Sequence, residues 1–205
     1  MQISAIEVLV FIFNRFRQKV SAEKRAELVQ VANSENAGHE DGFFNKDSVQ
    51  TLCFYKIIMK LTLGLDCYND LLTTLASYFG QTDYEKIKSL KIIAAFFDGN
   101  DLKALETKYI VSLLQYASTM SFNDKQPIRY YSAHSLVNVV GKLQYDDLVI
   151  DHLARMMDTE SSDMKIHIVN AVKAMSSDYN EYKKFIFQKA RVDNHYLVRK
   201  AVADM

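Results

Sequence analysis

Histidine is the side chain in this protein best suited to proton transfer or metal binding at neutral pH. The chain has five: His39, His134, His152, His167 and His195. None has a histidine or cysteine three or four residues away, the spacing that places two metal ligands on one face of a helix. The two cysteines, Cys53 and Cys67, have no partner cluster either. The sequence therefore predicts no catalytic residue, no metal site and no cofactor, and we interpret the chain as a non-enzyme.

Two short segments resemble ligand loops but lack essential residues. Residues 38–42 are Gly-His-Glu-Asp-Gly, without the lysine and the preceding strand of a phosphate-binding loop. Asp98, Asn100 and Asp101 resemble the start of a calcium loop, but Gly99 lies at the wrong position. No glutamate follows at the distance that such a loop requires. We therefore interpret residues 98–101 as an ordinary turn.

The composition allows a packed core and argues against a strongly charged partner. Of the 205 residues, 49% are hydrophobic, and a single proline and six glycines leave little for the turns of an all-β fold. The 25 basic and 25 acidic residues cancel, which gives no reason to favour nucleic acid or an anionic membrane. We expect Cys53 and Cys67 to be buried, reduced thiols. This predicts a cytoplasmic protein, with a nuclear location left open.

The apolar run at residues 8–13 is short for a membrane span. A spanning helix needs about 20 apolar residues, and Asn14, Arg15 and Arg17 interrupt this run. We expect residues 1–20 to form a buried N-terminal capping helix; a membrane-associated helix is the alternative.

Apolar residues recur at helical spacing through almost the whole chain. The expected helices span 3–19, 22–33, 47–63, 67–80, 83–97, 104–120, 127–142, 145–157, 162–176, 179–191 and 195–205. Start signals support several of them: capping boxes at 47–50 and 82–85, a cap at Asp66, and Pro127 in a first turn. The polar stretch 33–46 is expected to be a loop and the first interior site of proteolysis.

A dipeptide of an apolar residue and a base recurs in register. Ile128-Arg129, Met164-Lys165 and Val198-Arg199 follow one another at spacings of 36 and 34 residues, each at the start of a helical stretch. A period in the thirties is typical of stacked helical hairpins. Val49 and Ile87 open earlier helices at looser spacings. The helices from 22 onward then pair into five hairpins of an A and a B helix, with Leu136 and Val172 buried on equivalent B-helix faces.

The pattern resembles the HEAT/armadillo repeat superfamily. A polar or acidic residue lies six positions before each base: Asn123 before Arg129, Thr159 before Lys165 and Asp193 before Arg199. The resemblance implies an all-α fold, a right-handed α-solenoid of about five hairpins over 21–205 within a single domain, 1–205. It also implies that these residues form a polar ladder between adjacent repeats.

One helix carries a second, narrower resemblance. Residues 128–140 are similar to one repeat of the vacuolar scaffold family that organises a phosphoinositide kinase–phosphatase complex. The similarity covers this helix alone.

Stacked repeats present extended concave surfaces, which favours a protein-interaction scaffold or adaptor. We expect it to bind a peptide or helix of a partner on the B-helix face. The candidate binding residues are Arg129, Tyr130, His134, Asn138, Lys165, Asn170, Arg199 and Lys200. Two alternatives stay open at this point: the bases can serve the ladder, and the tyrosines can fill space between hairpins.

The alternative function is nucleic-acid binding, as in DNA-alkylation-repeat or chromosome-associated helical-repeat proteins. Neutral overall charge weakens it. A tubulin-binding repeat array is a further reading, weakened because such arrays use a tryptophan in a turn and this chain has none.

The last B helix is short. The register from Val198 places Val202 and Met205 on the core face and then ends. We therefore expect an apolar outgoing face on the fifth hairpin. This predicts that the chain is the N-terminal portion of a longer solenoid or self-associates through its open C-terminal repeat.

Overall fold

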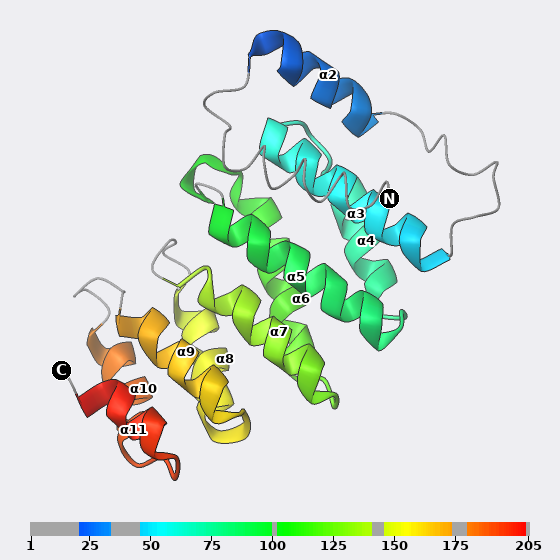
Figure 1. Cartoon of the computed structure of the whole chain (residues 1–205). Coiled ribbons are helices and arrows are strands. Elements are labelled where there is room, and N and C mark those ends of the chain that lie inside the picture. The colour runs from blue at the N-terminus through cyan, green and yellow to red at the C-terminus, as the bar shows by residue number, and fades with distance from the viewer. Residues whose placement is uncertain (1–20, 34–45, 100–101, 141–145, 174–179, 204–205) are drawn as a thin grey trace. The chain divides into compact units, whose positions relative to one another are not determined.

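The computed structural model describes residues 21–33, 46–99, 102–140, 146–173 and 180–203 (Figure 1). These described residues are helical with short connections and contain no strand. The helices are α2 (Ala22–Asn33), α3 (Lys46–Leu63), α4 (Tyr68–Tyr78), α5 (Asp83–Gly99), the 3-10 turn η2 (Leu102–Ala104), α6 (Thr107–Met120), α7 (Gln126–Val137), α8 (Asp146–Thr159), α9 (Ser162–Lys173), α10 (Asn180–Arg191) and α11 (Tyr196–Ala203). The all-α fold class is confirmed for this part of the chain.

Most helix bounds match the sequence prediction within a few residues, and two differ for a visible reason. Helix α6 begins at Thr107 rather than 104, because 102–104 forms a separate 3-10 turn. Helix α7 ends at Val137 rather than 142, because the amides of Val139 and Val140 bond to carbonyls three residues back, which tightens the last turn. The expected helix 3–19 and nearly all of the expected loop 33–46 lie outside the described residues.

The predicted start signals are partly confirmed. The Thr82 hydroxyl accepts the Glu85 amide at 3.4 Å. The Asp66 carboxylate accepts the Tyr68 amide at 3.3 Å. Pro127 lies in the first turn of α7, where its missing amide costs no helical bond. The expected capping box at 47–50 falls on side chains outside the description.

Helix α3 ends in a glycine motif that the sequence interpretation left out. Gly64 has φ of 74°, a conformation in which a Cβ would be strained. Its amide donates to Leu61 at 3.1 Å, and the Leu65 amide donates to Lys60 at 3.0 Å. These two bonds form a Schellman cap, which satisfies the last carbonyls of α3.

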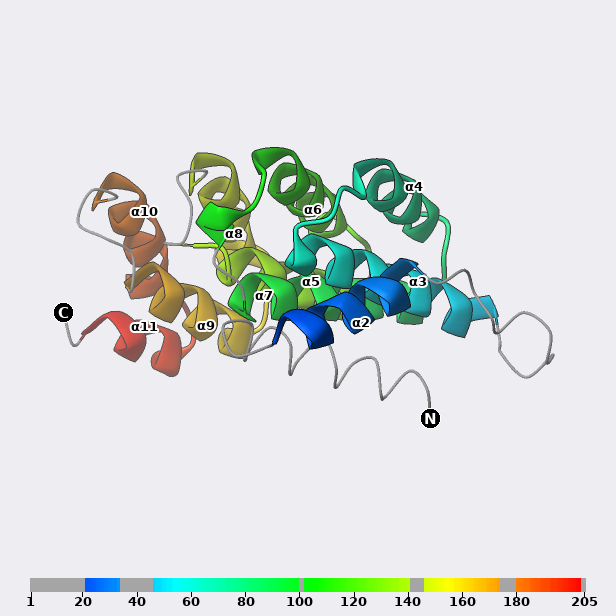
Figure 2. The same cartoon turned by 90° about the horizontal axis from the view of Figure 1, so that it is seen from above.

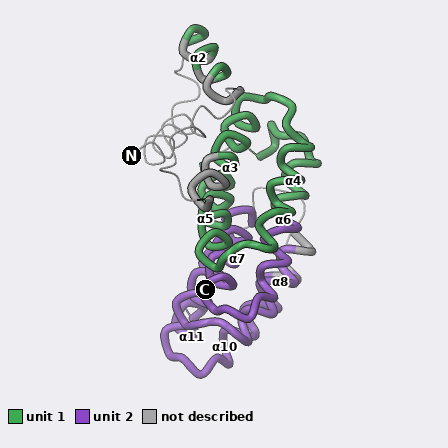
Figure 3. Tube along the Cα trace, turned by 90° about the vertical axis from the view of Figure 1, so that its right-hand side faces the viewer, with its two compact units in different colours: residues 1–113 green, residues 114–205 purple. Residues whose placement is uncertain are grey.

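Contacts divide the chain into two compact units, residues 1–113 and 114–205 (Figure 3). In the first unit, α3 packs against α2, α4 and α5, and α4 also contacts α5. Its core holds fully buried side chains from α3, α4 and α5, including an edge-to-face pair of Phe54 and Tyr78 with centroids 5.5 Å apart.

In the second unit, α7 packs against α8 and α9, α10 against α8 and α9, and α11 against α9 and α10. Within this unit α8 and α10 form one row, and α7, α9 and α11 form another (Figure 2). Leu136 on α7 and Val172 on α9 are both fully buried, as the register predicts. Val198 and Val202 of α11 are buried as well.

The cysteine prediction holds for one residue only. Cys67 is buried, but Cys53 is half-buried, and both are free thiols. Burial raises the pKa of the Cys67 thiol to about 11. Cys67 is therefore protonated and unreactive at neutral pH.

Candidate helix-surface binding site

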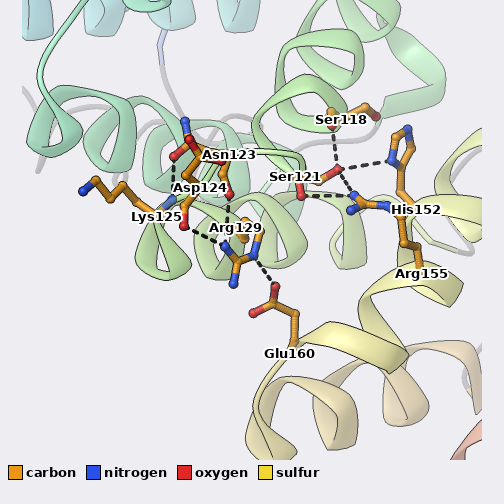
Figure 4. A network of polar contacts seen from close by, with 9 residues as sticks. All are labelled: Ser118, Ser121, Asn123, Asp124, Lys125, Arg129, His152, Arg155 and Glu160. Carbon is orange, nitrogen blue, oxygen red and sulfur yellow. Dashed lines mark hydrogen bonds and ion pairs between the residues drawn. The ribbon is translucent and has the colours of Figure 1, made fainter.

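Arg129 links two turns of the second unit (Figure 4). Its Nη1 donates to the carbonyls of Asn123 and Asp124, each at 3.0 Å, in the turn before α7. Its Nε donates to Glu160 Oε1 at 2.7 Å, in the turn before α9. The Glu160 side chain is fully buried, whereas that of Arg129 is 21% exposed. The guanidinium therefore fixes its own turn and attaches it to the next one.

Further along the chain, the two roles of Arg129 are divided between Lys165 and Arg199. Lys165 Nζ on α9 donates to Asp193 Oδ2 at 2.7 Å, in the turn before α11. Arg199 Nη1 donates to the carbonyls of Asp193 and Asn194 at 2.7 and 2.9 Å. The side chains of Arg129, Lys165 and Arg199 therefore hold turns, and we call these contacts the ladder.

The ladder differs from the sequence interpretation in its partners. The spacing of six joins Arg199 to the backbone carbonyl of Asp193 and not to its carboxylate. That carboxylate instead accepts Lys165 and the His195 amide. Although burial raises the pKa of Asp193, these bonds lower it more, and the net shift is downward. The sequence interpretation did not identify Glu160 as a ladder residue, because it lies one position after the motif residue Thr159. Only its burial in the structure distinguishes it.

Ser121, His152 and Arg155 form a cluster that resembles a catalytic pair but lacks its chemistry (Figure 4). Ser121 Oγ lies 3.2 Å from His152 Nδ1 and accepts Arg155 Nη2 at 2.7 Å. The hydroxyl itself donates to the Ser118 carbonyl at 2.7 Å, and Ser121 is fully buried. A nucleophile must give its proton to the base, and here the proton is held elsewhere. The cluster ties α8 to the end of α6.

A row of aromatic rings crosses from α7 to α9. Tyr130 contacts Tyr131 and His134 with centroids 5.2 and 5.9 Å apart. His134 contacts His167 on α9 at 4.5 Å. We call these four residues the ring row. All four are half-buried, so part of each residue remains exposed.

His167 is the member of the ring row with unused hydrogen-bonding capacity. Its Nε2 is buried and has no hydrogen-bond partner. Burial lowers the pKa of His167, and the nearby His134 lowers it further. A neutral imidazole with one unsatisfied nitrogen is costly inside a protein.

The structure brings together only some of the candidate residues. Tyr130 and His134 belong to the ring row. Arg129 and Lys165 belong to the ladder, and Arg199 and Lys200 are exposed on α11. Asn138 caps the end of α7 and is half-buried, and Asn170 is exposed on α9.

The sequence interpretation did not include His167 in the binding set. In the repeat register, His167 corresponds to Tyr131 and not to His134. His134 and His167 therefore do not occupy equivalent positions on α7 and α9. A comparison of equivalent positions in the sequence does not identify their contact.

A second polar cluster lies in the first unit around Tyr109. Its hydroxyl donates to Asp66 at 2.7 Å and accepts the Cys67 amide at 3.2 Å. Hydrogen bonds from Tyr109 and the Tyr68 amide lower the pKa of Asp66. Lys108 lies over the rings of both tyrosines. These groups satisfy one another, so we interpret the cluster as a fixed connection between α4 and α6.

Within the described ranges, no three His, Cys, Asp or Glu side chains gather closely enough to hold a metal ion. None of the helices in those ranges is both long and apolar enough to cross a membrane. Comparison of the chain with protein-family models, with curated proteins and with solved structures finds no match.

Proposed function

We propose that this chain is a non-enzymatic, cytoplasmic scaffold of the HEAT/armadillo type, an α-solenoid that binds a partner protein on its B helices. The ring row of Tyr130, Tyr131, His134 and His167 is the observation that carries the proposal. Aromatic side chains bury much area at little entropic cost, and they are enriched among residues that dominate binding.

The ladder supports the choice of the ring row as the binding site, because it accounts for two of the other candidate residues. Arg129 and Lys165 form ion pairs with Glu160 and Asp193, so we assign these two bases to stabilising the surface rather than to binding the partner. The ring row combines apolar ring area with the polar hydroxyl and imidazole groups of its two tyrosines and two histidines. A peptide or helix supplies both kinds of group.

Affinity capture from native cells with the full chain as bait tests the proposal. The double variant Tyr130→Ala with His134→Ala should lose the captured protein. Tyr84→Ala is the matched control, because Tyr84 is 60% exposed on α5 in the first unit. Circular dichroism must show an unchanged fold for both variants. Equal capture by the double variant and the wild type would refute the ring row as the binding site.

Nucleic-acid binding is the competing outcome. It would show as retention on immobilised DNA that falls steeply with salt, because phosphate contacts release counterions. If the chain is retained in this way, and if the Tyr130 and His134 double variant captures the same protein as the wild type, nucleic-acid binding would replace the scaffold proposal.

A further inference from the structure

Two exposed phenylalanines of the second unit each have a cation over the ring. Phe122 and Phe185 are 61% and 50% exposed. Arg155 Cζ lies 3.8 Å from the centroid of the Phe122 ring, and Lys189 Nζ lies 5.3 Å from that of Phe185. The two cations differ in their anionic partners. Lys189 donates to both carboxylate oxygens of Asp158 at 2.6 and 2.7 Å, whereas Arg155 forms no ion pair with any described residue.

The Arg155 guanidinium is held in position although it lacks a carboxylate. Its Nη2 donates to the Ser121 carbonyl at 3.0 Å and to the Ser121 hydroxyl at 2.7 Å (Figure 4). Its Nε and Nη1 form no hydrogen bond with the described residues. Arg129 is anchored on the same turn through two carbonyls, and its Nε then binds Glu160. Arg155 therefore has an anchor like that of Arg129 but no acid, and a group held in advance loses less entropy when it binds.

The neighbouring imidazole of His152 adds no second charge. The Ser121 hydroxyl gives its only proton to the Ser118 carbonyl, so His152 Nδ1 donates in the 3.2 Å contact with Ser121 Oγ. Nε2 then carries the lone pair of a neutral ring, and burial and Arg155 lower the pKa of His152. Asp151, one turn before Arg155 on α8, is exposed and forms no ion pair with it. These groups therefore present one cation beside an exposed aromatic ring.

We call Phe122, His152 and Arg155 the α8 site, and we propose that it binds an acidic side chain of a partner protein. The carboxylate accepts the Nε or Nη1 of Arg155, as Glu160 accepts the Nε of Arg129. An apolar residue beside that acid packs against Phe122. A single cation favours a carboxylate over a phosphate group, because protein sites for phosphorylated segments use clusters of arginine.

The inference does not rest on the ring row. Figure 2 shows α8 in one row of helices of the second unit, and α7 and α9, which carry the ring row, in the other. A partner segment on the α8 site can therefore be tested separately from the proposed binding surface.

Peptide selection tests the inference with a defined probe. Random peptides displayed on phage are selected against the full chain, and those that bind Arg155→Gln equally well are discarded. We expect the remaining peptides to share an acidic residue beside an apolar one. Phe122→Ala should weaken their binding, measured by fluorescence anisotropy. Phe185→Ala is the matched control and should leave binding unchanged, because Phe185 is also exposed beneath a cation, and that cation already has Asp158.

A double-mutant cycle separates a direct contact from an effect on folding. Changing the acidic residue of a selected peptide to its amide should weaken binding to the wild type about tenfold, the loss of one charge-assisted hydrogen bond. The same change should have little effect on the weaker binding to Arg155→Gln. If Arg155→Gln fails to fold, the amide peptide and Phe122→Ala still give the test, because neither alters the anchor on Ser121.

Four outcomes would overturn the inference. The first is a selection without acidic peptides. The second is an amide peptide that binds the wild type as tightly as the acid does. The third is loss of the selected peptides in the variant Tyr130→Ala with His134→Ala, which would assign them to the ring row. The fourth is retention on immobilised DNA that requires Arg155, which would favour a nucleic acid as the ligand.

Discussion

Arg129 and Glu160 lie 31 residues apart and form an ion pair with an Nε–Oε1 distance of 2.7 Å and a fully buried carboxylate. The other carboxylate oxygen, Oε2, is buried without a hydrogen-bond partner. The pair therefore depends on Arg129 alone to compensate a buried charge. Removing the base and removing the acid should have different consequences.

We predict that Arg129→Met lowers the free energy of unfolding by about 3 kcal/mol or more, because it leaves Glu160 buried and unpaired. Glu160→Gln should cost less, about 1–2 kcal/mol, since Arg129 keeps its two carbonyl contacts. Combining Arg129→Met with Glu160→Met should recover part of the loss. Urea unfolding measures all three.

The exposed pair of Lys184 and Glu181 is the control, with side chains 64% and 85% exposed. Glu181→Gln should change the free energy of unfolding by less than about 0.5 kcal/mol.

Arg129→Glu should reduce the stability of the protein more than its affinity for a partner, because Arg129 first holds the ladder. A folded Arg129→Glu protein of normal stability that loses its partner would reverse that order.

Leu136 tests the core of the second unit. It is fully buried, so Leu136→Ala should cost about 2–5 kcal/mol through the cavity that it leaves. Leu72→Ala is the control, because Leu72 is 41% exposed on α4. Similar losses in the two variants, measured by chemical denaturation, would show that the assigned register is wrong.

Acidification should destabilise the protein through two histidines. Burial lowers the pKa of His167, with a further contribution from His134. Burial and Arg155 lower the pKa of His152. The unfolded chain, with histidine pKa near 6.5, therefore binds more protons than the folded chain just below that pH. The stability contributed by the two neutral histidines is fully present above pH 6.5, and it is lost as the pH falls toward their lowered pKa values.

The test is the melting temperature of wild type and His167→Gln between about pH 7.5 and pH 5.5. The wild type should lose more stability over this range than the variant. An equal loss in both would mean that His167 does not titrate differently in the folded state.

Cys67 should resist alkylation in the native protein. The residue is 4% exposed and burial raises its thiol pKa to about 11, so little thiolate is present at pH 8. Iodoacetamide labelling followed by mass spectrometry should modify Cys67 only after denaturant is added. Rapid native labelling of Cys67 would contradict the described burial.

Helix positions in the described ranges could be predicted, because apolar spacing and caps are local properties of the sequence. The buried register of Leu136 and Val172 followed from the same periodicity. The early end of α7 could not be predicted, because it depends on bonds of Val139 and Val140 that compete with helix continuation.

The contacts between helices were predicted less well. Glu160 and His167 were missed because their roles depend on which side chain of the preceding hairpin they meet, Arg129 and His134 respectively. The last hairpin exposes large apolar side chains, among them Phe185, Tyr196 and Leu197, beside exposed bases that the sequence interpretation did not consider. Of these bases, Lys184 and Arg191 lie on α10.

The ladder also gives the second unit a direction. Arg129 and Lys165 each reach forward to the turn of the following hairpin. Local opening of α10 and α11 would therefore remove Asp193 from Lys165 and leave an uncompensated base on α9. In native-state hydrogen exchange, α10 and α11 should exchange as one cooperative unit before α8 and α9.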